Sequence, residues 1–597
     1  MLRRIVHKLA VFREVRRQDG FGAAFKVARN SLRDSVVYRT RRVLEVLHLR
    51  RPRPRLEWRR PAASQHVLSV VVPVFDTPED VLRECLDSVV SQKHEAWELC
   101  VCDDCSSNRR TIDVLREYRG SDPRIRIVRA PRNLGIAGAT NLAAEQASGE
   151  FLALLDHDDR LHPYALAEIA AAVERLPDID LVYTDEDKIE ADGSHSEPYY
   201  KPDWSPDHLT SVMYLLHCLA VRKALFWKLG GLRSRYDGAQ DYDLALRASR
   251  QARRIHHIPR ILYHWRKIPG SAAAVVDAKP DALTAGRRAL EDYAAGLEPP
   301  ASVEDGLLPG TFRLRRSLAH RPDVSLVILS SDPEVEVPGR GRIRVLQNFV
   351  RSVVERSTYG AYRLVVVDDG ELCDETIAVL DAAGATRATF HDPQRSSDGF
   401  NFARKANYAL SLIETDLVIL LNDDLEVVSP GWIEALLEPL MDPDVAFVGA
   451  RLLYPDGRIQ HAGLVLGVVG PATHAFYGRP GDAVGYNAFT HVIRNYSAVT
   501  GAALATRTAT LRELGPMDEA LAHDYNDTDF CLRAVERGYR VVYTPFAELL
   551  HFEGATLRRR AQDPAEVAVF SERWEQVIAR DPFYNPNLPR DRADYVV

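Results

Sequence analysis

The chain carries the same order of short apolar runs and acidic residues twice, and this internal repeat limits the possible fold more than any other feature. Leu68–Phe75 (LSVVVPVF) and Val324–Ser331 (VSLVILSS) are β-branched apolar runs, which are typical of buried parallel strands. Each run is followed by a helix-like segment and then by a second apolar run. That second run ends in paired aspartates in both halves: Asp103 and Asp104, and Asp368 and Asp369.

A third apolar run in each half also ends in acidic residues. These runs are Phe151–Asp159 (FLALLDHDD) and Leu417–Asp424 (LVILLNDD). Alternation of strands and helices predicts a doubly wound α/β sheet, so we expect two Rossmann-like, mainly parallel domains in tandem. Ligands bind at the carboxyl ends of strands in such sheets, so the acidic ends of neighbouring strands should meet in one cleft. Neither first strand is followed by GxGxxG, which disfavours a dehydrogenase.

The repeat and its flanking segments predict five regions. Proline residues end a basic segment before the first repeat, and a helix-like stretch near Pro280–Ala295 lies between the repeats. The predicted regions are a basic helical arm (1–62), a first α/β domain (63–270), a linker with a helix (271–322), a second α/β domain (323–560) and a C-terminal helix and tail (561–597).

Charge is distributed unevenly along the chain. Residues 1–60 contain 18 Lys and Arg and 5 Asp and Glu, whereas the rest contains 59 basic and 79 acidic residues. An acidic body disfavours binding to nucleic acid, which needs a basic surface. The basic arm suits an anionic membrane surface, and no apolar run is long enough to span a bilayer. We therefore expect a cytoplasmic protein that residues 1–60 can hold at the inner face of the membrane.

The third-strand acids predict a site for a hard divalent cation. Asp156 and Asp158 are two positions apart, and carboxylates with this spacing can share Mg²⁺ or Mn²⁺ with phosphate oxygens. A solvated loop or a helix cap is the ordinary alternative for an isolated pair. The recurrence of the cluster as Asn422-Asp423-Asp424 in the second half favours the cation site.

A second group of acids begins an amphipathic helix in each half. The first half has Asp241 and Asp243, and the second half has Asp527 and Asp529. One acid of each pair is expected to cap its helix. The other acid of each pair is a candidate general base that takes a proton from a hydroxyl group.

A histidine follows each of these acids at nearly constant spacing. His264 lies 23 positions after Asp241, and His551 lies 24 positions after Asp527. A lone histidine is more often a packing or hydrogen-bonding residue. The preserved spacing instead favours a third metal ligand in each half.

In these motifs both halves resemble family 2 inverting glycosyltransferases with the GT-A fold. The resemblance implies that Asp156 and Asp158 form the family's metal-binding DxD motif and that Asp241 and Asp527 are the bases. It also implies that Asp424 and His551 are metal ligands in the second half, as in rhamnosyl- and galactofuranosyl-transferases. The expected donor contacts are Pro73, Phe75, Asp103, Asp104 and Asp156 in the first half, and Asp368, Asp369 and Asn422 in the second.

The resemblance further implies a bifunctional, metal-dependent hexosyltransferase. The stretches YTDEDKI (Tyr183–Ile189) and KPDWSPD (Lys201–Asp207) are similar to two-domain enzymes of O-antigen and capsule assembly. The expected donors are UDP- or dTDP-sugars, and the expected acceptor is a growing, lipid-linked cell-surface polysaccharide. Because Asn422 replaces a DxD carboxylate, a silent sugar-binding second half is an alternative. A nucleotidyltransferase is disfavoured, because neither first-strand loop is a Gly-rich basic phosphate cradle.

Several other residues are weaker candidates. Trp204 and Trp265 could stack on a sugar or base, or pack in a core. Arg494 could contact phosphate, and His217 and Asp187 could line the acceptor side.

Overall fold

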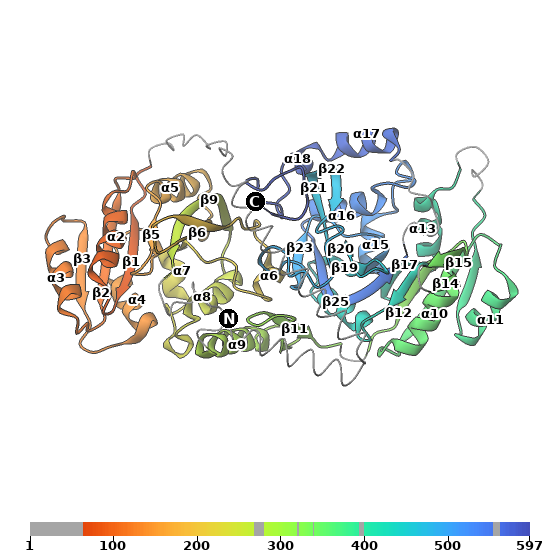
Figure 1. Ribbon diagram of the computed structural model, residues 1–597, viewed down its shortest axis with the longest axis horizontal. Helices are drawn as coiled ribbons and strands as arrows, with labels where there is room; N and C mark the ends of the chain where they lie inside the picture. The colour runs from red at the N-terminus through yellow and green to blue at the C-terminus, as the bar shows by residue number, and fades with distance from the viewer. Residues whose placement is uncertain are drawn as a thin grey trace. The chain divides into compact units, whose positions relative to one another are not determined.

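The computed structural model of the protein describes residues 64–267, 280–318, 321–337, 340–392, 399–552 and 562–596 (Figure 1). The predicted basic arm, residues 1–62, lies outside this part of the chain, so its helices and its membrane contact stay predictions. Within the described ranges, no helix has the length and apolar character needed to cross a membrane.

The first half forms a mixed sheet in which the first four strands of the path run parallel. Strand β8 pairs antiparallel with both β4 and β6, and β9 runs parallel to β6. A further strand, β7 (His195–Tyr199), pairs with β6. The path is β3 (Ile125–Arg129), β2 (Trp97–Asp103), β1 (Leu68–Val74), β4 (Phe151–Leu154), β8 (Leu219–Arg222), β6 (Leu181–Ile189), β9 (Ile255–Arg266) and β5 (Arg160–Leu161).

The second half repeats this path strand for strand, with the same directions. Two short strands, β20 (Ile459–His461) and β23 (Arg494–Tyr496), pair with β19 and β25. The path is β16 (Thr386–Thr389), β15 (Tyr362–Asp368), β12 (Val324–Leu329), β17 (Leu417–Asn422), β24 (Ala503–Arg507), β19 (Val445–Leu453), β25 (Arg540–His551) and β18 (Leu425–Val427). The predicted tandem α/β fold is confirmed.

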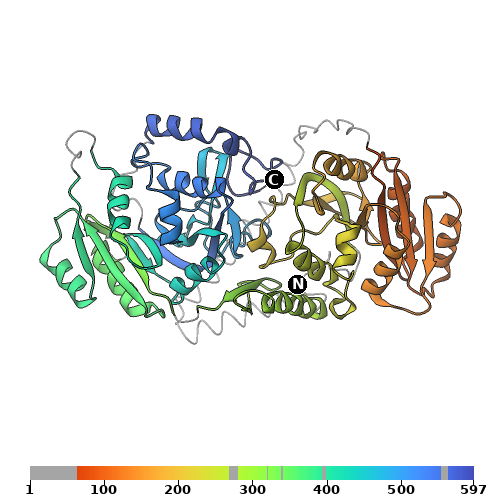
Figure 2. The same cartoon turned by 180° about the vertical axis from the view of Figure 1, so that it is seen from behind.

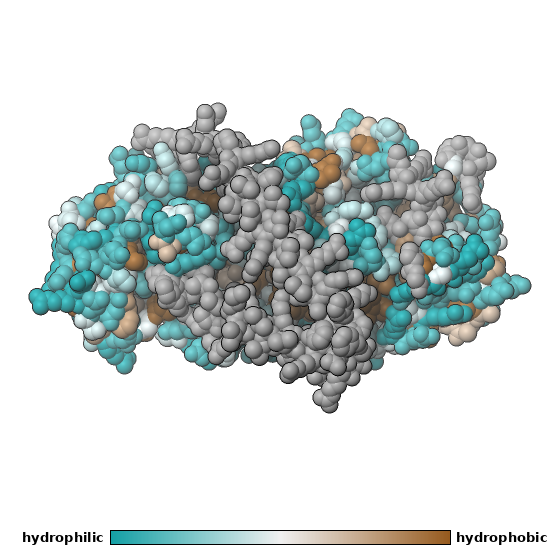
Figure 3. Space-filling model, in the orientation of Figure 1, coloured by the Kyte–Doolittle hydropathy of each residue, from teal (hydrophilic) through white to brown (hydrophobic). Residues whose placement is uncertain are grey.

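Helices cover both faces of each sheet (Figure 2). Successive side chains of a strand point to opposite faces, so Val70 and Val72 of β1 join one core cluster and Val71 joins the other. The helices on the two faces of the first sheet are α2 (Glu79–Val90) with α5 (Ala165–Arg175), and α4 (Gly135–Glu145) with α8 (Gln240–Ser249). Those of the second sheet are α10 (Val345–Arg356) with α14 (Trp432–Leu440), and α13 (Phe402–Ser411) with α16 (Asn526–Glu536). Where the structure describes the face shown in Figure 3, hydrophilic residues predominate.

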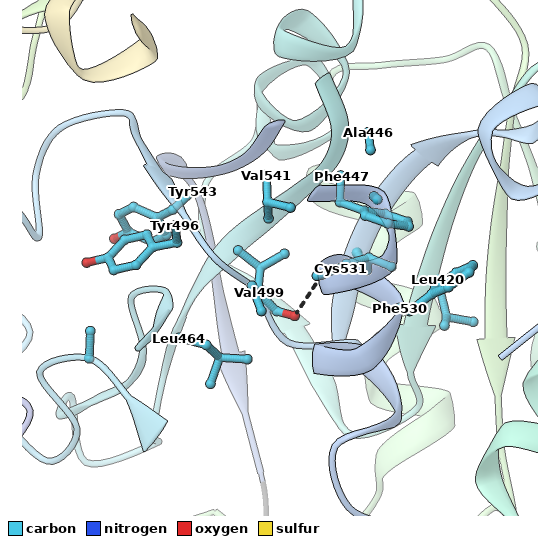
Figure 4. Packing of buried hydrophobic residues seen from close by; sticks show 14 of the residues in the cluster. Leu420, Ala446, Phe447, Leu464, Tyr496, Val499, Phe530, Cys531, Val541 and Tyr543 are labelled. Carbon is cyan, nitrogen blue, oxygen red and sulfur yellow. Dashed lines mark hydrogen bonds between the residues drawn. The ribbon is translucent and has the colours of Figure 1, made fainter. Parts of the chain in front are cut away.

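The core under α16 fixes the start of that helix. Phe530 and Cys531 pack against Phe447 of β19, and the rings of Phe447 and Phe530 lie 5.0 Å apart (Figure 4). The Cys531 thiol donates to the backbone oxygen of Val499 at 3.8 Å. The helix is therefore held to the loop before β24, with Asp527 in its first turn.

Two described segments outside the sheets contain further helices and strands. Helix α9 spans Pro280–Ala295 and is followed by the hairpin β10 (Ala301–Asp305) and β11 (Phe312–Arg316). The C-terminal part forms α17 (Pro564–Arg573), α18 (Glu575–Ala579) and a tail. Asn585 of this tail donates to the Asp185 carboxylate at 3.0 Å and to the Lys201 backbone oxygen at 2.9 Å.

Candidate active sites

The carboxyl ends of β1 and β4 border a cavity in the first half. Its lining includes Pro73, Asp156, His217, Asp241 and Tyr263. Strands β1 and β4 are adjacent and parallel, which brings Pro73 and Asp156 to one edge of the sheet. The structure thus places the predicted base beside the first DxD acid, although 85 positions separate them in the sequence.

Asp241 is the acid of its pair that faces this cavity. It lies in the first turn of α8, and one of its carboxylate oxygens accepts from the Tyr242 backbone N–H at 2.7 Å. Burial raises the pKa of Asp241 to about 6, although His217 and the Tyr242 N–H act in the opposite direction. Asp243, in contrast, is buried in ion pairs with Arg233 and with Arg247. Asp243 therefore anchors the helix, which leaves Asp241 free for chemistry.

The DxD segment presents a dense group of acids. Ligand-type atoms of Asp156, Asp159 and His217 all lie within 4.8 Å of one another. Asp159 is buried and accepts from the Tyr263 hydroxyl at 2.6 Å and from the Arg266 backbone N–H at 2.7 Å. Burial raises the pKa values of Asp158 and Asp159. Crowded carboxylates of this kind fit a divalent cation, which offsets their mutual repulsion.

His217 enters this site from the loop before β8. Its Nδ1 lies 3.0 Å from a Glu186 carboxylate oxygen, and its ring stacks on Tyr263 with centroids 4.6 Å apart. Burial opposes protonation, but the Glu186 carboxylate together with the charges of Asp156 and Asp159 outweighs burial and raises the pKa of His217 to about 9. The sequence pointed to His217 only as a residue on the acceptor side. Its contact with the DxD acids arises from the pairing of β8 with β4, and we find no motif that signals it.

The structure does not bring His264, the predicted third ligand, into the group around Asp156. Its Nδ1 lies 2.6 Å from Asp187. The preceding residue, Tyr263, reaches Asp159, and adjacent strand residues point to opposite faces. The strand pairing differs between the halves. His264 pairs with Arg160, which lies two positions after Asp158. His551 pairs with Leu425, which lies only one position after Asp424. A slip of one residue moves a side chain to the other face.

The second half brings together the three residues predicted for its strand-end site. His551 Nε2 lies 2.9 Å from an Asp424 carboxylate oxygen and 3.5 Å from the Asn422 amide nitrogen. The other ring nitrogen, Nδ1, lies 2.9 Å from the Gln460 side-chain oxygen, which fixes the ring orientation. Asp423 instead accepts from the Ser330 hydroxyl at 2.6 Å, and burial raises its pKa to about 7.

Asp527 occupies the place of Asp241 in the second half. It lies in the first turn of α16 and accepts from the Gly501 N–H at 2.7 Å and the Thr528 N–H at 2.6 Å. A methyl group at Gly501 would approach Asp527 Cβ to 3.2 Å, so any larger residue there would push Asp527 by a few tenths of an ångström. Asp529 is fully buried and pairs with Arg533 and Arg573. Each half therefore has one acid held in arginine pairs and a second acid, Asp241 or Asp527, that accepts hydrogen bonds from backbone N–H groups.

The paired aspartates that end the second strands already have partners within the protein. Asp104 accepts from the Leu134 and Gly135 N–H groups, and Asp103 pairs with Arg129. In the second half, Asp369 lies 2.9 Å from the Lys405 ammonium group, and Asp368 accepts from the Gly370 N–H. These contacts shape the loops around each cleft. Phe75, at the end of β1, is 47% exposed and open to a ligand.

Two weaker candidates prove to be packing residues. Arg494 is fully buried, and its guanidinium group lies 3.7 Å from the centre of the Phe489 ring, so it does not reach a phosphate site. Trp204 packs against the core around α4 and α8. Trp265 contacts His217, with ring centroids 5.3 Å apart, and thus lies beside the first cleft.

Family models match both halves of the chain. The model "Glycosyl transferase family 2" matches residues 69–230, and the model "Glycosyltransferase like family 2" matches residues 334–568. Both halves belong to glycosyltransferase family 2. The resemblance drawn from the repeated motifs is thereby confirmed.

Similar proteins cover most of this chain. The uncharacterized protein y4gI of Sinorhizobium fredii is 39% identical over 89% of the chain and 58% of its own length. The O-antigen biosynthesis protein RfbC of Myxococcus xanthus is 35% identical over 88% of the chain and 41% of its own length. The chain thus spans about half the length of these relatives. A crystal structure of S. aureus TarS residues 1–349 with UDP-GlcNAc is 21% identical, with a TM-score of 0.33 over 39% of this chain and 67% of that one.

Proposed function

We propose that the tandem glycosyltransferase is bifunctional and that each half transfers one sugar from a nucleotide-diphosphate sugar with inversion. One observation carries the proposal. Two sheets of identical topology each place a carboxylate from a helix start, Asp241 or Asp527, at the end of the sheet where an acidic strand-end cluster lies. A base and a diphosphate-binding group at one cleft are what a direct displacement requires.

In each half the aspartate at the helix start acts on the acceptor. Asp241 or Asp527 takes the proton of an acceptor hydroxyl while that oxygen forms a bond to the anomeric carbon. The bond from this carbon to the diphosphate oxygen breaks, and the nucleotide diphosphate leaves with the electron pair. Attack from the side opposite the leaving group inverts the configuration at the anomeric carbon. Asp243 and Asp529 keep each base at the start of its helix through their arginine pairs.

The strand-end clusters fit Mg²⁺ or Mn²⁺. By the family's DxD pattern, Asp156 and Asp158 would hold the cation in the first half, where Asp156 lies in the compact acid group, and Asp424 with His551 would hold it in the second. Carboxylate-rich groups suit these hard cations, and a bound cation would neutralise charge on the leaving diphosphate. Asn422 supplies an amide in place of one carboxylate and can hydrogen-bond a donor ribose.

The substrates follow from the relatives and from the cleft residues. The similarity to an O-antigen biosynthesis protein supports a growing cell-surface polysaccharide as acceptor. The basic residues 1–60, which suit an anionic membrane surface, support a lipid carrier for it. The donor is a UDP- or dTDP-sugar. Its nucleotide would lie along Pro73, Phe75 and Asp103 in the first half and along Asp368 and Asn422 in the second.

A silent second half is the competing proposal. It rests on Asn422, whose amide nitrogen faces His551 at 3.5 Å where the first half has the Asp156 carboxylate. Such a half would bind a glycan or a nucleotide without transferring a sugar.

The rate of the transfer catalysed by the first half should fall as the pH drops below about 6. A general base works only when it is deprotonated, and burial raises the pKa of Asp241 to about 6. Below that pH the rate should fall about tenfold per pH unit, since the ionised fraction falls at that rate. The measurement is single-turnover transfer against pH for the Asp527→Asn variant, which reports the first site alone. A rate that stays level down to pH 4 would exclude Asp241 as the base.

The basic arm should bind the enzyme to anionic membranes. Residues 1–60 carry 18 Lys and Arg, and each contributes about 1 kcal/mol near an anionic surface. We expect the full chain to pellet with vesicles of mixed anionic and zwitterionic lipids and to remain in solution with purely zwitterionic ones. Equal pelleting by a chain that lacks residues 1–60 would reject this role of the arm.

A further inference from the structure

Three neighbouring strands of the first sheet bring two imidazoles and a carboxylate to one point outside the transfer site. Strand β6 pairs with β7 on one side and with β9 on the other. Asp187 of β6 pairs with His264 of β9, while Ile189, two positions further along β6, pairs with His195 of β7. Residues two apart on a strand share a face, so Asp187, His195 and His264 project from the same side.

The three side chains are already in contact. His264 Nδ1 lies 2.6 Å from one Asp187 carboxylate oxygen, and His195 Nδ1 lies 3.0 Å from the other. The two imidazole rings are 4.5 Å apart and nearly perpendicular. A third imidazole, that of His162, lies 5.9 Å from the His264 ring. The group is distinct from the DxD site, because Tyr263 and His264 point to opposite faces of β9.

We propose that Asp187, His195 and His264 form a site for a borderline-soft divalent cation of the Zn²⁺ type. Two imidazole nitrogens and one carboxylate oxygen are the donor set that such ions prefer, whereas Mg²⁺ prefers oxygen donors alone. With the proton of each imidazole on Nε2, both Nδ1 lone pairs and Asp187 face a common point. Around a tetrahedral Zn²⁺ such donors stand about 3.3 Å apart, so small side-chain rotations would admit the ion.

One member of the cluster is accessible to solvent, so a cation could bind and leave reversibly. Asp187 and His264 are largely buried, whereas the His195 side chain is 40% exposed. An ion can therefore enter from the His195 side, and water can fill its fourth position. The bound ion would tie β6, β7 and β9 together, and β9 also carries Tyr263, which holds Asp159 of the transfer site. This inference does not depend on the proposed bifunctional transfer.

The test is zinc uptake by the full chain after chelation and in excess Mg²⁺. Bound zinc is measured by elemental analysis after gel filtration, and Co²⁺ is used in parallel for its visible absorption. His195→Ala is the main variant, because His195 is exposed and its loss should leave the fold intact. His256→Ala is the matched control, because His256 lies on β9 outside the cluster. His551→Gln accounts for ions bound at the second transfer site.

The wild type, His256→Ala and His551→Gln should each retain one zinc equivalent that His195→Ala and Asp187→Asn lack. The same Co²⁺ absorption should disappear in those two variants, and zinc should raise the melting temperature of the wild type but not of His195→Ala. Equal zinc in the wild type and His195→Ala, including no zinc in either, would overturn the proposal. The cluster would then be a hydrogen-bonded triad that joins the three strands.

Discussion

Replacing Asp527 with asparagine should remove one of two glycosidic linkages from the product and leave the other. The amide keeps the size of the side chain, and its single oxygen can still accept from one of the Gly501 and Thr528 N–H groups, but it cannot take a proton at neutral pH. Loss of a general base lowers a rate by about 10²–10⁴-fold. Replacing Asp241 with asparagine should remove the other linkage by the same argument.

The two variants serve as controls for each other. Each keeps one intact site in the same chain, so loss of one linkage with retention of the other excludes a general folding defect. Products formed from a panel of UDP- and dTDP-sugars are identified by mass spectrometry, and rates are measured under single-turnover conditions. If Asp527→Asn leaves every product unchanged, the second half is silent. If each variant loses both linkages, the two halves do not act independently.

Replacing Lys201 with methionine should lower the free energy of unfolding far more than replacing the partly exposed Lys188 does. Lys201 is fully buried, and its ammonium group donates to the backbone oxygens of Thr184 and His217 at 2.7 and 2.9 Å. It also donates to Leu216 and lies 3.4 Å from the Glu186 carboxylate. Removing one partner of a buried ion pair costs about 3–5 kcal/mol, because the remaining charge and acceptors stay buried without it. The His217 loop at the first cleft would lose its anchor.

Unfolding in urea, followed by circular dichroism, measures this effect. Lys188→Met is the matched control, because Lys188 lies on β6 and forms a partly exposed ion pair with Glu197. That change should lower the free energy of unfolding by about 1 kcal/mol or less. In the folded fraction of Lys201→Met, the linkage made by the first half should decline more than that made by the second. Equal stability of the two variants would contradict the role assigned to Lys201.

Most of the fold could be predicted because its signals are local. Apolar β-branched runs marked the central strands, and helix α9 lies where the sequence indicated a helix. The cleft acids Asp241 and Asp527 were identified with their helices, since both begin amphipathic segments after a loop. Residue spacing alone left open which acid of each pair faces the cleft, and only the family resemblance assigned Asp241 and Asp527. That choice depends on distant arginines such as Arg233 and Arg573, which pair with the other acid.

The sequence alone determined that two domains of one α/β family follow each other, and that each has acids at the strand ends and at a helix start. These features can be recognised from the order of the motifs along the chain and from the regular spacing of apolar residues. Only the tertiary structure decided that His551 joins Asp424 whereas His264 joins Asp187 and His195. The spacing from acid to histidine is almost the same in both halves, but strand register sets the direction of each side chain. The two spacings differ by one residue in the sequence, but only the strand pairing shows that this difference turns the first histidine away from the cleft.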